Sequence, residues 1–163
     1  MGENMRYEIA VYTHAGALER LIRRPHTPAR VTSEDIALYK DERLKTAVNE
    51  QHRRSLEREF SEVPFPDVLP PYARLQADEA GNLWLQDYPR PGDEQHRWSV
   101  FGPDSRLVAM VLTPSGLRVL QIGDDFLLGQ IRDEDDVEHI VVYQLDKTQQ
   151  QSSKRGGGAA REK

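Results

Sequence analysis

The sequence contains no cysteine. Disulfide bonds, thiolate catalysis and cysteine-based zinc sites are therefore excluded. The compartment stays undecided, because a secreted protein need not carry disulfides. The chain has no apolar run near the roughly 18 residues that a membrane-spanning helix needs. Its first ten residues, MGENMRYEIA, show no apolar core of a signal peptide, and Arg6 stands where a myristoylation signal has serine or threonine.

Motifs for metal-assisted or nucleophilic catalysis are missing as well. No H-x-x-x-H or H-E-x-x-H pair occurs, so no zinc site is predicted. No Gly-x-Ser-x-Gly elbow occurs, and Ser115-Gly116 is interpreted as a turn. We expect surface positions for the five histidines, which are His14, His26, His52, His96 and His139. We therefore assign no catalytic, cofactor-binding or metal-binding residue, and no cofactor.

Charge is unevenly distributed along the chain, whose net charge is −5. Residues 1–60 carry 11 Lys/Arg against 10 Asp/Glu, and residues 61–147 carry 7 against 16. Residues 148–163 carry 4 against 1. The body of the chain is thus acidic, which argues against a groove that follows a nucleic-acid backbone. A nucleic-acid partner is therefore not expected.

The densest charge cluster is the acidic run DEDDVE at residues 133–138. One interpretation is a calcium site, because hard cations prefer clustered carboxylates. The Asp-x-Asp-x-Asp-Gly pattern is absent, however, since position 137 is Val and no Gly follows. The run is therefore interpreted as a solvated turn between two strands.

Arginines gather in the first 60 residues. Anion binding is one interpretation of this cluster. Ten acidic residues share the same segment, so local ion pairs on a solvated face are favoured. The arginines concerned are Arg20, Arg23, Arg24, Arg30, Arg53, Arg54 and Arg58.

Internal repeats are visible in the sequence. The segment 8–25 aligns without gaps on 97–114, at an offset of 89 residues. A third copy at 140–145 matches the start of the segment at an offset of 42 from 98–103, and LWL at 83–85 corresponds to FLL at 126–128, an offset of 43. These matches predict a structural unit of about 42 residues, with chance similarity of apolar strands as the alternative.

Alternating apolar residues and Gly/Pro/Asp/Ser turns predict short strands. The first tryptophan of the chain, Trp84, begins one of them directly after the Gly81-Asn82 turn, where we expect it to be buried by packing. The strands fall in groups of two, four and three. The predicted ranges are 6–12 and 17–23, then 72–78, 82–88, 96–101 and 106–112, then 117–122, 125–131 and 138–145.

A helical segment interrupts the strands at residues 32–60. Thr32 and Asp35 match a capping box, which marks the start of a helix. A mostly apolar stripe at four-residue steps follows, and it predicts one long helix or two short ones. Four prolines at 63–72 end it. The residues of the stripe are Ile36, Lys40, Leu44, Val48, His52, Leu56 and Phe60. Residues 148–163, rich in Gln, Ser and Gly, are predicted to be disordered.

The segment ADEAGNLWLQDYP, followed by RWSVFGPDSRLVAMVLTP, resembles a blade of the NHL-like six-bladed β-propellers. Typical blades read Asp-x-x-Gly-Asn-Leu-Trp-Val and then Val-Phe-Asp-x-x-Gly-x-Leu. Gly102 stands where that pattern has Asp, and Ser105 where it has Gly. Residues 117–145 look like the closing blade of bacterial proteins in this group. The positions that match the blade pattern in the first two segments are Asp78, Gly81, Asn82, Leu83, Trp84, Val100, Phe101, Leu107 and Pro114.

The resemblance implies an all-β partial six-bladed propeller over residues 5–147. Its parts would be a half blade at 6–24, the helical insertion at 32–60, a full blade at 71–114 and an incomplete last blade at 117–146. Six blades need about 24 strands, so the chain looks like the C-terminal part of a longer protein. Its open sheet edges predict weak stability and self-association.

The function implied by the resemblance is a non-enzymatic scaffold that binds a ligand or a protein. The alternative is a fragment of a calcium-dependent propeller hydrolase or lactonase. An extracytoplasmic location follows only if the full-length protein carries an export signal.

Overall fold

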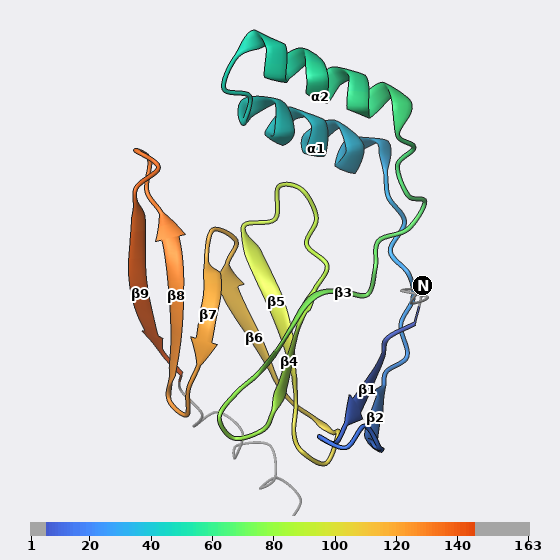
Figure 1. Ribbon diagram of the computed structural model, residues 1–163, viewed down its shortest axis with the longest axis vertical. Coiled ribbons are helices and arrows are strands. Elements are labelled where there is room, and N and C mark those ends of the chain that lie inside the picture. The colour runs from blue at the N-terminus through green and yellow to red at the C-terminus, as the bar shows by residue number, and fades with distance from the viewer. Residues whose placement is uncertain (1–5, 146–163) are drawn as a thin grey trace, which may run out of the picture. The chain divides into compact units, whose positions relative to one another are not determined.

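The computed structural model describes residues 6–145, which are mostly β-sheet with two helices (Figure 1). All three sheets are antiparallel, and their strand orders are β1-β2, β3-β4-β5-β6 and β7-β8-β9. The strands are β1 (Glu8–Tyr12), β2 (Leu18–Arg23), β3 (Tyr72–Ala77), β4 (Leu83–Asp87), β5 (Gln95–Phe101), β6 (Leu107–Pro114), β7 (Arg118–Ile122), β8 (Phe126–Arg132) and β9 (Glu138–Gln144). The helices are α1 (Ser33–Lys45) and α2 (Glu50–Glu62).

The nine strands confirm the prediction from sequence, including their grouping into two, four and three. Their ends differ from the predicted ones by at most two residues. The three sheets are open within the described part of the chain, so the propeller arrangement stays a prediction. The disorder predicted for 148–163 concerns residues outside the described range.

The repeat at an offset of 89 residues is also present in the strand pairing. In the β1–β2 hairpin Ile9 pairs with Ile22, and in β5–β6 the equivalent Trp98 pairs with Val111. Each hairpin has its register shift at the same place, before Tyr12 in one and before Phe101 in the other. Equivalent residues therefore make equivalent pairs throughout the two hairpins.

The turns of these two hairpins share a backbone conformation as well. Gly16 has φ of 79° and its equivalent Ser105 has φ of 65°. Both lie in the left-handed region, which glycine enters without steric cost. Ser105 thus adopts the conformation for which the resembling blades have glycine.

The register corrects the weaker repeat by one residue. Leu83 pairs with Phe101 in β4–β5, whereas Leu127 pairs with Tyr143 in β8–β9. Phe101 and Tyr143 are equivalent at the offset of 42 residues between β5 and β9, so their partners Leu83 and Leu127 are equivalent too. The predicted match of residues 83–85 to residues 126–128 is therefore wrong by one residue. The offset changes between strands because the β8–β9 connection, residues 133–137, is two residues shorter than the β4–β5 connection, residues 88–94.

The helical segment forms two helices, which run side by side in opposite directions (Figure 1). Thr32 is the N-cap of α1 and Asp35 completes the capping box, as predicted. Asn49 caps α2 by accepting a hydrogen bond from the His52 backbone N–H. The predicted stripe is interrupted at Val48, which lies between the helices and is 83% exposed. Neither helix has the length and apolar composition needed to cross a membrane.

The chain divides into two compact units. Unit 1 contains the described residues up to Ala77 together with Gly81–Ser115, and unit 2 contains Asp78–Ala80 together with the described residues from Gly116 onward. Unit 1 has an apolar core contributed by β1, β2, β4, β5 and the residue before β1, made of Tyr7, Ile9, Ile22, Leu83, Leu85 and Phe101. The buried apolar residues of unit 2 are Leu117, Val119, Ile122 and Leu127.

Candidate functional site

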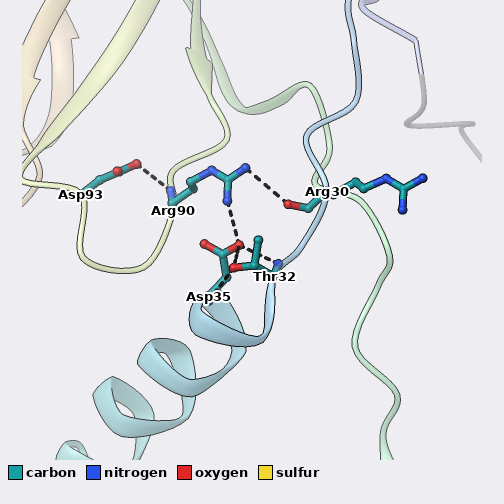
Figure 2. A network of polar contacts seen from close by, with 5 residues as sticks. All are labelled: Arg30, Thr32, Asp35, Arg90 and Asp93. Carbon is teal, nitrogen blue, oxygen red and sulfur yellow. Dashed lines mark hydrogen bonds and ion pairs between the residues drawn. The ribbon is translucent and has the colours of Figure 1, made fainter.

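A clamp of polar side chains joins the start of α1 to the β4–β5 connection (Figure 2). The Asp35 carboxylate accepts hydrogen bonds from the Thr32 backbone N–H and from the Thr32 hydroxyl, both at 2.8 Å. The same oxygen lies 2.7 Å from Nη1 of Arg90, whose Nη2 donates to the Arg30 carbonyl. The Asp93 carboxylate accepts a hydrogen bond from the Arg90 backbone N–H, which stabilises the turn of this connection. One buried carboxylate thus fixes both a helix cap and a distant loop.

These contacts change the acidity of Asp35. The two hydrogen bonds from Thr32 are the largest effects and lower the pKa of its carboxyl, burial opposes them, and the contact with Arg90 adds a further lowering of the pKa. The carboxylate is therefore held in the ionised form that binds Arg90.

We expect the clamp to weaken in acid. A carboxyl whose pKa is lower in the folded than in the unfolded state stabilises the fold at pH values above about 4, and that contribution is lost as the pH falls through the folded pKa. Carbon-detected NMR should therefore show Asp35 titrating below the ordinary aspartate range, and Arg90→Ala should move its pKa upward. A pKa of Asp35 at or above about 4 would contradict this assignment.

A second polar cluster lies in the core of unit 1, where sequence reasoning missed it. Nη1 of Arg24 donates to the Ser99 hydroxyl at 3.0 Å, and the guanidinium carbon lies 5.7 Å from the centroid of the Tyr7 ring. Burial raises the pKa of Tyr7, with Ser99 and Arg24 opposing it. Ser99 is fully buried, and an arginine cannot take its proton. The cluster therefore holds the Arg24 guanidinium against Ser99 and the Tyr7 ring.

Three aromatic rings pack together around the helical hairpin. Tyr39 of α1 lies edge-on to Phe60 of α2 and to Phe65, with ring centroids 6.1 and 5.9 Å away. The Lys40 ammonium lies 5.3 Å from the Phe65 centroid and 5.9 Å from that of Phe60. The rings join α1 to α2 and to the segment that follows, and the lysine lies within cation–π distance of two of them.

The acidic run forms the turn between β8 and β9, as predicted. The Asp133 carboxylate lies 2.6 Å from Nε2 of His139 and accepts the backbone N–H groups of Asp135 and Val137. These contacts, led by that with His139, lower the pKa of Asp133. The turn thus uses the carboxylate of its first residue, Asp133, to close its own backbone. Across residues 6–145, no group of His, Asp or Glu side chains is arranged to hold a metal ion.

Among the arginines of the first 60 residues, some form local ion pairs and others contact distant segments of the chain. Arg23, Arg53 and Arg54 form the predicted ion pairs, with Glu8, Glu57 and Glu50 respectively. Arg20 instead donates to the backbone carbonyls of Gly102 and Gly81. Its role in joining β2 to two turns was missed, since the sequence pattern contains no information about which carbonyls it reaches.

The histidines are dispersed over both units, and their surface placement is only partly correct. His14 lies in the β1–β2 turn and is exposed, as is His139 at the start of β9. His52 and His96 are partly buried, and burial lowers the pKa of His96. Ser115 lies between β6 and β7, in the predicted turn.

Strand β6 exposes a row of aliphatic side chains on one face. Leu107, Met110 and Leu112 are 45%, 52% and 60% exposed, and we call them the β6 strip. They pair with Phe101, Ser99 and Arg97 of β5. The opposite face of β6 is less exposed, with Ala109 and Val111 partly buried. Thr113 on that face is buried and accepts a hydrogen bond from the Trp98 indole N–H. The strip is therefore on the more exposed face of the strand.

Comparison of the chain with protein-family models, with curated proteins and with solved structures found no match.

Proposed function

We propose that this protein is a non-enzymatic scaffold of the β-propeller type that binds another polypeptide along the β6 strip. The observation that carries the proposal is the exposure of Leu107, Met110 and Leu112 in one row, on the more exposed face of the strand. Contiguous exposed apolar side chains are a common feature of surfaces that bind other proteins.

Two features of the strands support the propeller part of the proposal. The β3–β4–β5–β6 sheet is a four-stranded antiparallel sheet in sequence order, which is the build of a propeller blade. The β1–β2 hairpin repeats the register and the irregularity of β5–β6, as expected for successive copies of one unit. The resemblance of residues 71–114 to NHL-like blades agrees with both features.

Selection from a random-peptide display library tests the binding function. Peptides enriched on the immobilised chain should bind Met110→Lys at least about tenfold more weakly, because the new charge would have to be desolvated. Leu18→Lys is the matched control, since Leu18 is the repeat equivalent of Leu107, is 57% exposed and lies on β2. Failure to enrich any peptide, or equal losses in both variants, would overturn the proposal.

Calcium titration by calorimetry separates the scaffold from the calcium-dependent hydrolase that the resemblance also implies. In the described residues the Asp133 carboxylate of the acidic turn already accepts two backbone N–H groups and contacts His139. We expect no saturable heat of calcium binding. A saturable heat would favour the hydrolase class.

A further inference from the structure

Strand β9 is an edge strand with little of the usual protection. In the described chain it pairs only with β8, over seven residue pairs from Phe126–Gln144 to Arg132–Glu138, with no register shift. Natural edge strands are commonly protected by charged side chains, especially lysine, by a proline or by a bulge, which hinder pairing with another chain. The sequence of β9, EHIVVYQ, has no lysine and no proline, its pairing shows no bulge, and its one acidic residue, Glu138, is at its first position.

The free edge of β9 carries the backbone groups of alternate residues. Leu145 donates its N–H to the Asp125 carbonyl, and Asp133 donates to the Val137 carbonyl, so odd-numbered residues bond to β8. Bonding directions alternate along an antiparallel strand. Glu138, Ile140, Val142 and Gln144 therefore direct their N–H and C=O groups to the free edge.

The repeat shows what these positions do inside a sheet. At the offset of 42 residues, Ile140 and Val142 correspond to Trp98 and Val100 of β5, which pair with β6. Trp98 and Val100 are 1% and 3% exposed, whereas Ile140 and Val142 are 64% and 66% exposed. Strand β9 thus has the side chains of an interior strand at the edge of its sheet.

We propose that β9 pairs with β9 of a second copy of this chain, antiparallel about a two-fold axis at Val141. In this register Ile140 lies opposite the partner's Val142, and Glu138 lies opposite the partner's Gln144. All four residues that face the free edge then face each other, which allows about eight backbone hydrogen bonds. A shift of two residues in either direction leaves Glu138 or Gln144 without an opposite residue in the partner strand.

The side chains fit the same register. Both Ile140–Val142 pairs join exposed β-branched residues, which stabilise neighbouring strands. His139 lies opposite the partner's Tyr143, and no two like charges are opposed within the strand. A two-fold interface is self-complementary, so each favourable pair occurs twice.

Charge outside the strand supports a second copy as the occupant. Antiparallel pairing places the end of one β9, at Gln144, beside the acidic turn of the partner. That run, residues 133–138, contains five acidic residues, whereas residues 148–163 contain four Lys/Arg and one Glu. The basic segment of each copy thus follows a strand that ends at the partner's acidic turn. The two acidic turns are separated by the length of the strand, roughly 20 Å.

Sedimentation of the full chain over a concentration series tests the proposal, with a pair of complementary substitutions. Ile140→Lys and Val142→Glu should each raise the dimer dissociation constant by at least about tenfold, since each places charges opposite aliphatic residues. The double variant should restore the dimer, because each new lysine then lies opposite a new glutamate in the partner. Circular dichroism of each variant checks that the sheet is intact, and the double variant controls for a loss of fold.

The outcomes separate this proposal from the binding function of the β6 strip. A chain that stays monomeric at all concentrations, or a double variant that stays monomeric while folded, would overturn pairing through β9. A dimer that withstands both single variants and is lost in Met110→Lys would place self-association on the β6 strip, and would also overturn it. Peptide binding at the β6 strip is independent of all three results.

Discussion

Replacing Trp84 by alanine should lower the free energy of unfolding by about 3–5 kcal/mol, as large-to-small changes of buried aromatics do. Trp84 is 5% exposed, which confirms the burial expected from its place after the Gly81-Asn82 turn. It lies on the face of β4 opposite to Leu83 and Leu85, because successive side chains of a strand alternate. Its loss therefore leaves a cavity outside the Leu83–Leu85 core, which surrounding side chains fill only in part.

Urea unfolding followed by circular dichroism measures this loss. Leu112→Ala is the control, because Leu112 is 60% exposed and its truncation should change the free energy of unfolding by less than about 0.5 kcal/mol. Trp84→Phe, a smaller truncation, keeps the comparison possible if the alanine variant does not fold. In a Trp98→Phe background, the fluorescence of Trp84 should have the short-wavelength maximum of a buried indole. A solvent-exposed maximum would refute the assigned burial.

Leu85→Ala should lower the free energy of unfolding by about 2–5 kcal/mol, because Leu85 is buried on the other face of the same strand. Leu85 has no exposed surface and belongs to the core that β4 and β5 share with Tyr7, Ile9 and Ile22. The loss of stability has two parts: the removed atoms no longer contribute the free energy of their transfer out of water, and the cavity left behind is only partly filled.

The cross-strand neighbour Leu75 is a matched control for Leu85. The two leucines pair directly between β3 and β4 and lie on the same face, but Leu75 is 45% exposed. Leu75→Ala should therefore cost well under half as much in the same urea experiment. Equal losses for the two variants would show that the core does not extend over β4 as the structure places it.

Local features of the sequence sufficed to place the elements. Strands and turns were predictable because alternation and the special backbone angles of turn residues act over a few neighbours, as at Gly16 and Gly81. The start of α1 was predictable because Thr32 and Asp35 form a capping box three residues apart. The division of the helical segment into two could not be decided, since Val48 continues the stripe in sequence although it lies between the helices.

Contacts between distant segments were beyond the sequence. Asp35 was identified as part of a cap, but its partner Arg90 lies 55 residues away and reaches it only through the path of the β4–β5 connection. The Arg24–Ser99 contact spans 75 residues in the same way. Side-chain type gives no measure of such distances, so neither polar cluster could be assembled before the fold was known.

Burial shows most clearly what the sequence determined and what it did not. Strands β5 and β9 have matching apolar patterns, and the sequence alone placed both in antiparallel sheets. The tertiary structure decided that Trp98 is buried whereas Ile140 is exposed. The reason is physical: an alternating pattern specifies which residues share a face, but only the neighbouring strands and layers determine whether that face and the edge beside it are removed from water.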